Sequence, residues 1–311
     1  MYFNAFASGT GPLDLSGSEE FASLAQSAND FGMTVRLPVR YCSRNAVVNG
    51  VRLHFLEWGD PSAPPVLLLH GGNMTAHSWD LVSLNLAARH HVIALDQRGH
   101  GDSEWPRDGD AAIPTLAEDI RHFIETLELE RPSIVAHSMG GLAALMLLSR
   151  HDVVGRCVLV DISPEASGEG REGIREFVRA AREFDSVEEY VERVSAYEPN
   201  RSRELILRTM RYNLMQRADG KLVSKHFPRT ARPDGDARPM RGVTLSDVTS
   251  IRCPVLLLRG EQSTVLTPEA AGRLVAALPE CTLVTVPDCA HNIHTQNPRG
   301  FLSAALPFLE A

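Results

Sequence analysis

The stretch Val135-Ala136-His137-Ser138-Met139-Gly140-Gly141 decides how this chain folds. The apolar, β-branched residues 132–135 before it are typical of a buried strand, and residues 142–148 after it are good helix formers without proline or glycine. A strand, a sharp turn and a helix in this order hold the serine of the turn above a sheet edge, at the positive end of the helix. Gly140 satisfies the need of such a turn for a small neighbour, although Ala136 stands where glycine is usual. The stretch predicts a reactive Ser138, and the alternative is a serine in an ordinary strand–helix loop.

The alternation of strand and helix continues on both sides of this stretch. The turn Asn49-Gly50 joins two expected strands within residues 39–59. Further apolar strands are expected at 66–69, 92–95, 157–162, 254–260 and 282–286, and helices at 79–89, 116–127, 268–278 and the C-terminus. This order predicts a mostly parallel sheet covered by helices on both faces.

Polar residues follow several of the predicted strands. Ligands of such sheets bind beyond the carboxyl ends of the strands, because these ends meet at one edge. The residues placed there are His70, Asp96, Ser138, Asp161, the loop at Gly260, and His291. The sequence therefore predicts one site that is assembled from distant parts of the chain.

Composition and charge exclude several classes of function. The net charge of the 311 residues is -8, whereas a surface that binds nucleic acid would be basic. The sequence has no apolar run of about 18 residues that would span a membrane, and its first residues lack the pattern of a signal peptide. The five cysteines are odd in number and have no C-x-x-C spacing, which indicates reduced thiols without a metal or a disulfide framework. We expect a cytoplasmic protein that acts on a small molecule, without nucleic acid or membrane as partner.

Four motifs give the chain a family resemblance from residue 39 to residue 311. In chain order they are His70-Gly71-Gly72, Asp96-Gln97-Arg98-Gly99-His100-Gly101, His137-Ser138-Met139-Gly140-Gly141 and Ala290-His291. With them the chain resembles the α/β-hydrolase superfamily, which implies a mostly parallel, doubly covered sheet with an inserted helical cap and no cofactor or metal. Residues 160–164 and 259–263 add a likeness to serine esterases and to the enamide-cleaving (acetamidomethylene)succinate hydrolases.

The resemblance also divides the chain. Residues 1–36 form an N-terminal extension, residues 37–163 and 251–311 the hydrolase core, and residues 164–250 the cap. Helices are expected at 174–184, 187–194 and 204–216 of the cap, followed by a loop rich in proline, glycine and arginine. A short helix is expected in the extension. Three roles are open for the extension: it covers the site, it forms a dimer arm, or it is disordered. The sequence is compatible with a homodimer.

The site residues have separate expected roles. Ser138 is the nucleophile and His291 its general base, because a serine hydroxyl needs a base within hydrogen-bond reach; His294 is the second choice. The backbone N–H groups of Met139 and Gly72 are expected to form the oxyanion hole. Asn73 and His137 are expected beside the substrate. The segment from Asp96 to Gly101 is expected to be a structural turn, held by Asp96 and Arg98.

The acid that orients the base is less clear from the sequence. Many relatives carry an aspartate in a Gly-x-x-Asp context after the penultimate strand, but here Ser263 occupies that place. Asp161, at the end of the strand after the Ser138 helix, is the preferred acid because the order Ser, Asp, His is kept. Glu261 is the alternative, and Ser263 is expected to help hold the pair of Asp161 and His291.

The cap carries a local excess of positive charge. Residues 201–241 contain nine arginines and two lysines against four acids. A solvated helical face explains this pattern, and an arginine that binds a substrate carboxylate is the functional alternative. The sequence as a whole predicts a cofactor-free serine hydrolase of a carboxylic ester. The alternatives are hydrolysis of an enamide or a C–C bond in an acidic small molecule, and a non-catalytic receptor on the same fold.

Overall fold

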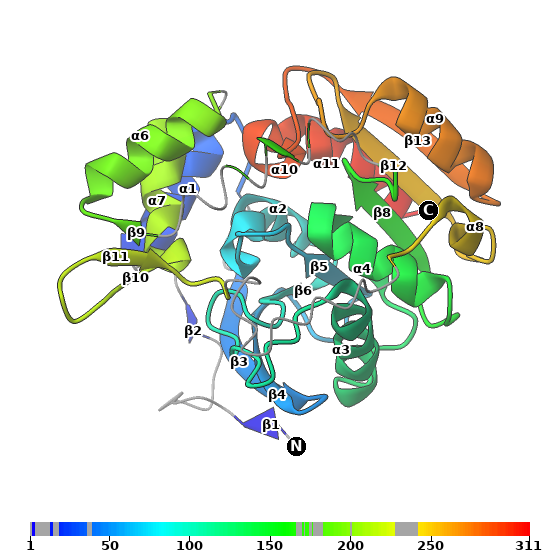
Figure 1. The fold of residues 1–311 in the computed structure, drawn as a ribbon, viewed down its shortest axis with the longest axis horizontal. Coiled ribbons are helices and arrows are strands. Elements are labelled where there is room, and N and C mark those ends of the chain that lie inside the picture. Colours follow the sequence, from blue (N-terminus) through cyan, green and yellow to red (C-terminus); the bar gives the residue numbers. More distant parts are fainter. Residues whose placement is uncertain are drawn as a thin grey trace.

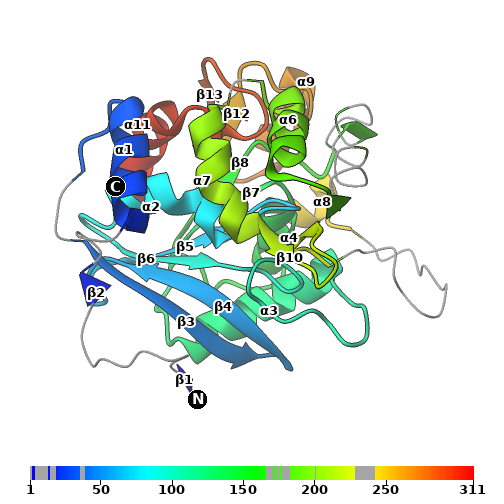
Figure 2. The same ribbon diagram turned by 90° about the vertical axis from the view of Figure 1, so that its left-hand side faces the viewer.

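The computed structural model describes residues 2–3, 13–14, 19–35, 39–165, 170, 172–173, 176, 183–199, 201–227 and 242–311. In this part of the chain a sheet of ten strands runs through the molecule, with helices on both of its faces, as Figure 1 and Figure 2 show. The sheet strands are β1 Tyr2–Phe3, β2 Leu13–Asp14, β3 Arg40–Val48, β4 Val51–Trp58, β5 Pro65–Leu69, β6 His91–Leu95, β7 Ser133–His137, β8 Arg156–Val160, β12 Val255–Gly260 and β13 Cys281–Val286. The helices around it are α1 Glu19–Asp30, η2 Ala76–Trp79, α2 Asp80–Leu86, α3 Ile113–Thr126, α4 Ser138–Leu148, α8 Leu245–Val248, α9 Pro268–Ala277, α10 Ile293–Gln296 and α11 Pro298–Leu309.

The order of the strands brings the predicted site residues to one edge. Strands β6, β5, β7, β8, β12 and β13 lie side by side and pair in parallel. Strands β3 and β4 extend the sheet antiparallel to β6. The prediction of a mostly parallel sheet covered on both faces is confirmed, and the carboxyl ends of β5, β6, β7, β8, β12 and β13 share one edge.

Alternate residues of the strands build two hydrophobic cores. On β5, Leu67 and Leu69 pack into the core with α3, α4 and α9, whereas Val66 and Leu68 pack into the core with α1, α2 and α11. Side chains on a strand point alternately to its two faces, so an uninterrupted apolar run is what a strand covered on both faces requires. Both cores are fully buried along β5, β6 and β7, and the loops at the strand ends rest on this base.

The segment that we call the cap, residues 164–250, enters the chain between β8 and β12. Apart from α8 at its end, which packs against α4 and α9, its described elements are α6 Val187–Tyr197, α7 Arg203–Asn213 and a small sheet of β9 Glu183–Phe184, β10 Leu214–Gln216 and β11 Leu222–Ser224. In Figure 1 these elements stand together beside α1, at one side of the core. A small core of its own, with Phe184, Val191 and Ile206 at its centre, holds the cap elements together.

The cap corrects one sequence expectation. The helix expected at 204–216 ends at Asn213, and residues 214–216 form β10, which pairs antiparallel with β11. This three-residue strand gains its hydrogen bonds from a partner six or more residues further on, so the helical periodicity of the preceding turns gives no warning of it. Of the helix expected at 174–184, residues 183–184 form β9 and most of the rest lies outside the described residues, as does the arginine-rich loop at 228–241.

Helix α1 is the described helix of the extension. Phe21, Leu24 and Ala28 are buried in the core with α2 and α11. Figure 2 shows α1 standing next to α7 of the cap and α11 of the core. The helix therefore packs against both parts of the molecule, and β1 and β2 pair with β3. Within the described residues, no helix is both long and apolar enough to cross a membrane.

Candidate active site

The turn between β7 and α4 holds Ser138 in a strained backbone. Its φ is 49°, in the left-handed region that costs a residue with a side chain about 1–3 kcal/mol. A Cβ added at Gly140 would lie 2.8 Å from the carbonyl oxygens of Leu69 and His70. Only glycine therefore lets the first turn of α4 approach the end of β5, which keeps the hydroxyl of Ser138 at the sheet edge.

The loop after β13 brings His291 to this serine. The Nε2 of His291 lies 3.0 Å from the Oγ of Ser138. Its Nδ1 lies 2.8 Å from the Oδ2 of Asp161, a residue with no exposed surface. Ser138 and Asp161 are 153 and 130 positions away from His291 along the chain, and the three residues form one hydrogen-bonded series. In this arrangement the imidazole can accept the serine proton while the carboxylate fixes its tautomer.

Three donors hold the carboxylate of Asp161. Besides His291, it accepts hydrogen bonds from the backbone N–H of Gly260, at 3.0 Å, and from the Oγ of Ser263, at 2.5 Å. The same Ser263 oxygen accepts the N–H groups of Val265 and Leu266, both at 3.2 Å. Ser263 thus links the acid to the backbone of the loop after β12, where the sequence placed it as an auxiliary residue.

The alternative acid, Glu261, lies elsewhere in this loop. Its side chain is exposed, and its Oε2 accepts the N–H of Asp288 at the long distance of 3.4 Å. The structure brings Asp161, and not Glu261, to the imidazole of His291.

The loop after β5 lies directly against Ser138. A Cβ at Gly71 would be 2.5 Å from the Nδ1 of His137 and 3.3 Å from the Cβ of Ser138. The next residue, Gly72, is exposed, and a Cβ there would meet nothing within 4 Å. Met139 is the second residue of α4 and lies in its first turn, directly after Ser138. Gly72 thus directly follows a glycine that touches Ser138, and it has open space beside it.

Asn73 follows these glycines with a φ of 60°. Its Oδ1 accepts a hydrogen bond from the Oγ of Ser224, on strand β11 of the cap, at 3.1 Å. The structure thus turns the carbonyl oxygen of this side chain toward the cap.

Two further histidines lie behind His291. His137 is 1% exposed, and its Nε2 donates to the carbonyl oxygen of His291 at 3.1 Å. His294 is equally buried and stacks on Trp79 with 4.0 Å between ring centroids. Burial, and then nearby positive groups, hold the pKa of both imidazoles well below the usual value, so both are neutral at pH 7. His137 is hydrogen-bonded to the loop that carries His291. His294, the second choice for the base, is stacked on Trp79. The placement of His137 beside the substrate stays a prediction.

The segment from Asp96 to Gly101 forms a braced turn. Asp96 accepts hydrogen bonds from His54, at 2.7 Å, and from the N–H groups of Ala76 and Asp102, and these contacts lower its pKa to about 2 despite burial. Arg98 binds Asp119 with two hydrogen bonds of 2.7 Å. His54, Asp96 and Asp102 are close enough to hold a metal ion, but these hydrogen bonds already occupy both oxygens of Asp96. Their arrangement is that of a structural turn.

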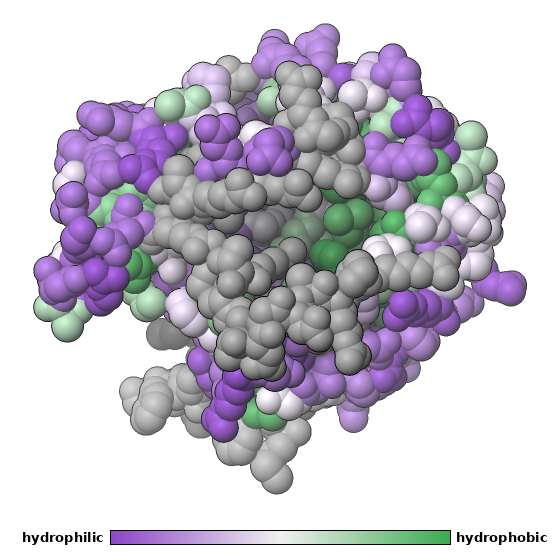
Figure 3. All heavy atoms as spheres, viewed as in Figure 1, coloured by the Kyte–Doolittle hydropathy of each residue, from purple (hydrophilic) through white to green (hydrophobic). Residues whose placement is uncertain are grey.

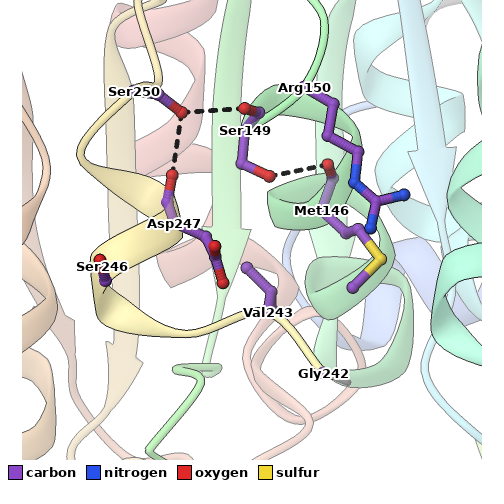
Figure 4. A pocket seen from close by; sticks show the side chains of 8 residues that line it. All are labelled: Met146, Ser149, Arg150, Gly242, Val243, Ser246, Asp247 and Ser250. Carbon is purple, nitrogen blue, oxygen red and sulfur yellow. Dashed lines mark hydrogen bonds between the residues drawn. The ribbon is translucent and has the colours of Figure 1, made fainter. Parts of the chain in front are cut away.

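A pocket of about 360 Å³ lies away from these residues, between the end of α4 and α8. Figure 4 shows Met146, Arg150 and Val243 on its walls. Met146 is two turns beyond Ser138 on α4, about 12 Å along the helix axis at 1.5 Å per residue. Figure 3 shows hydrophobic residues in a hollow near the middle of the face drawn there, and hydrophilic residues toward the outline of the molecule.

The fold agrees with what comparisons with known proteins find. The model of the Alpha/beta hydrolase family matches residues 66–304. The chain belongs to this family. The esterase Rv0045c of Mycobacterium tuberculosis is 28% identical to the family member described here over 297 residues, which cover 93% of this chain and 95% of that protein. Its crystal structure superposes with a TM-score of 0.75 at 28% identity and covers 95% of this chain and 99% of that chain.

A second relative has another activity. The 2-(acetamidomethylene)succinate hydrolase of Mesorhizobium japonicum is 27% identical over 273 residues, covering 87% of this hydrolase and 96% of that protein. A crystal structure of E-2-(acetamidomethylene)succinate hydrolase has a TM-score of 0.79 at 25% identity, with 88% of this chain and all of that chain covered. The resemblance and the fold inferred from the sequence are confirmed, and hydrolase chemistry is the activity that these relatives share.

The contacts between the cap and the loop after β5 could not be predicted from the sequence. Ser224 and Asn213 reach the loop after β5 from 151 and 138 positions away, at 3.1 and 3.3 Å. Neither residue belongs to a motif, and no local pattern distinguishes a serine or asparagine that binds a distant loop from one that faces water.

Proposed function

We propose that this protein is a serine hydrolase that cleaves a carboxylic ester of a small molecule through an acyl-enzyme on Ser138. The observation that carries the proposal is the hydrogen-bonded series from Ser138 through His291 to the buried Asp161. A serine hydroxyl becomes a useful nucleophile only when a base stands within hydrogen-bond reach and a third group orients that base.

The residues support a two-step reaction. His291 takes the proton of Ser138 as its oxygen attacks the ester carbonyl, and the negative charge that forms on the carbonyl oxygen is stabilised by the N–H groups of Gly72 and Met139. His291 then gives the proton to the leaving alcohol, which departs and leaves the acyl group on Ser138. Water, activated by His291 in the same way, releases the acid and restores the serine. The open space beside Gly72 is where the carbonyl oxygen would enter.

The charges of the described cap residues favour a neutral substrate. The two buried arginines, Arg201 and Arg208, already have acidic partners at 3.6 and 2.7 Å, Glu198 and Asp80. Four cations of the described cap that are exposed or half-buried are paired with acids as well: Arg203, Arg217, Lys221 and Lys225. Arg229, Arg232, Arg238 and Arg241 lie outside the described residues. A guanidinium that is already neutralised by a carboxylate gains little from a second one, so we favour a neutral ester over an acidic substrate.

One observation favours the enamide alternative. The succinate hydrolase structure covers nearly nine-tenths of this chain, and its substrate by name is an acidic enamide. The same serine chemistry would serve an enamide carbonyl. A comparison of neutral esters with acidic enamides therefore separates the two proposals.

Labelling with a fluorophosphonate tests the nucleophile. The probe should add to Ser138 in a one-to-one ratio, detected by mass spectrometry of the intact protein and of its peptides, and Ser138→Ala should abolish both labelling and turnover of p-nitrophenyl esters. The matched control is Ser246→Ala, because Ser246 is exposed on α8. A folded protein that binds the ester but neither labels nor turns over would instead support a receptor.

A further inference from the structure

The loop that carries Gly72 is attached to the cap at two points. Asn73 accepts a hydrogen bond from Ser224, and Thr75 donates one to the Oδ1 of Asn213. Since Gly72 directly precedes Asn73, these contacts lie one and three residues from the proposed oxyanion donor. If the Gly72 N–H is the second donor, the cap therefore holds the loop that carries this donor.

The two cap residues come from the same end of one hairpin. Leu214 of β10 pairs with Ser224 of β11, and the N–H of Lys225 donates to the carbonyl oxygen of Asn213 at 2.8 Å. Asn213 is fixed further by the hydroxyl of Tyr190, at 3.2 Å. The hairpin therefore presents Asn213 and Ser224 as a pre-ordered pair, because backbone pairing sets the spacing between them.

The residues after β11 fasten this hairpin to the core. Lys225 forms an ion pair with Asp102 at 2.7 Å, and the N–H of Phe227 donates to the carbonyl oxygen of Gly99 at 2.6 Å. The ring of Phe227 also meets Trp105 edge-on at 5.8 Å. The three attachment points lie in the braced turn after β6 or within four residues of its end, so the hairpin is anchored to a part of the core that does not include the loop it holds.

The backbone of Asn73 shows why the loop needs this support. A φ of 60° is accessible to asparagine but is less favourable than ordinary extended or helical backbone. The side-chain contact with Ser224 favours this conformation, which orients the peptide between Gly72 and Asn73, the neighbour of the peptide that carries the Gly72 N–H. Loss of the contact frees the loop to relax and moves the N–H away from the developing oxyanion.

We propose that Ser224 and Asn213 are positioning residues of the cap that set the oxyanion-hole loop by hydrogen bonds to Asn73 and Thr75. The proposal rests on the proposed serine hydrolase function. It implies that displacement of the cap hairpin slows the chemical step, because the same hairpin fixes a catalytic donor. Loss of one oxyanion donor lowers kcat by about 10²–10³-fold, so its displacement should cost about tenfold.

The first experiment compares kcat and KM of Ser224→Ala, Ser224→Thr and Ser246→Ala on a neutral p-nitrophenyl ester. Ser224→Ala should lower kcat about tenfold with KM changed less than twofold, and should slow inactivation by the fluorophosphonate in parallel, since both need the oxyanion hole. Ser224→Thr keeps the hydroxyl and should restore most of kcat, and Ser246→Ala should match the wild type. Thr75→Val removes the second contact from the core side and should lower kcat in the same direction. Thermal unfolding of each variant separates these effects from loss of fold.

The second experiment is a double-mutant cycle with Asn73→Gly. Glycine reaches a positive φ without help, so Ser224→Ala should change kcat less than twofold when it is added to Asn73→Gly. A tenfold loss in both backgrounds would overturn the inference, because Ser224 would then act on something other than Asn73. Wild-type kcat in both Ser224→Ala and Thr75→Val would overturn it too. If the wild-type protein itself neither turns over esters nor labels at Ser138, the proposed function fails, and this outcome is distinct from the other two.

Discussion

Asp161→Asn should lower kcat about 10⁴-fold on an ester substrate and leave KM close to the wild-type value. In the proposed reaction His291 becomes positively charged as it takes the serine proton, and the Oδ2 of Asp161 is 2.8 Å from its Nδ1. Coulomb's law with an effective dielectric constant of about 20 gives about 6 kcal/mol for unit charges at this distance. At about 1.4 kcal/mol for each factor of ten, this equals slightly more than 10⁴ in rate. The asparagine amide would also donate to Nδ1 and so favour the wrong tautomer.

Two variants of the neighbouring loop serve as controls. Ser263→Ala removes one of the three hydrogen bonds to the carboxylate, and the loss of about 1.5 kcal/mol corresponds to about a tenfold lower kcat. Glu261→Gln should change kcat less than twofold, because the carboxylate of Glu261 is exposed and directed toward Asp288. The double variant Asp161→Asn, Ser263→Asp should have a kcat at least tenfold above that of Asp161→Asn alone, because it again has a carboxylate in this loop. The N–H groups of Val265 and Leu266, which the serine oxygen accepts now, can hold that carboxylate in place.

Turnover of p-nitrophenyl acetate and butyrate at saturating and limiting concentrations gives kcat and KM. Titration with the fluorophosphonate gives the fraction of sites that remain competent, and circular dichroism with thermal unfolding reports on the fold. An Asp161→Asn protein within tenfold of the wild-type kcat, together with an inactive Glu261→Gln, would refute the reasoning and move the acid to the loop after β12.

Two further predictions concern stability. Because burial lowers the pKa of His294, the unfolded chain takes up a proton below about pH 6.5 that the native imidazole does not, so the free energy of unfolding falls as the pH falls. His294→Phe, which can keep a ring on Trp79, should reduce this loss by up to about 1.4 kcal/mol per pH unit below pH 6.5 in urea unfolding, and an unchanged slope would contradict it. Arg208→Met leaves Asp80 buried without its charged partner and should cost about 3–5 kcal/mol of unfolding free energy. Arg203→Met, which breaks an exposed pair with Glu188, is the control and should cost less than about 1 kcal/mol, so equal costs would argue against a role for burial.

Core strands could be predicted because their sequence pattern is local. A run such as residues 66–69 is apolar at every position, and only a strand covered on both faces accommodates that. The strand ends then place Ser138, Asp161 and His291 at one edge without any knowledge of their contacts. Their closeness in space could be predicted because the carboxyl ends of parallel strands lie at the same edge of the sheet, so residues that follow these strands are brought together there.

The cap was harder to predict because its order depends on partners that are distant in sequence. Residues 214–216 continue the amphipathic pattern of α7, but the antiparallel partner at 222–224 makes them a strand. The burial of Arg201 and Arg208 also differs from the solvated helical face that the charge pattern of the cap predicts. Arg208 belongs to a helix whose charge pattern indicates a solvated face, and it is buried only because α2 supplies Asp80 and α1 covers the contact.

The order of the strands explains why an acid on β8 can serve a histidine that follows β13. Strand β12 lies between them, so the loop that carries His291 has to cross its end. Gly260, the last residue of β12, permits this crossing, because a Cβ there would overlap the carbonyl oxygen of Ala290. The N–H of Gly260 meanwhile donates to the carboxylate of Asp161, so the residue that lets the loop cross also holds the acid. A side chain at residue 260 would move His291 away from both Asp161 and Ser138. Glycine at this position is therefore required for the contact between His291 and Asp161, which directly follows β8.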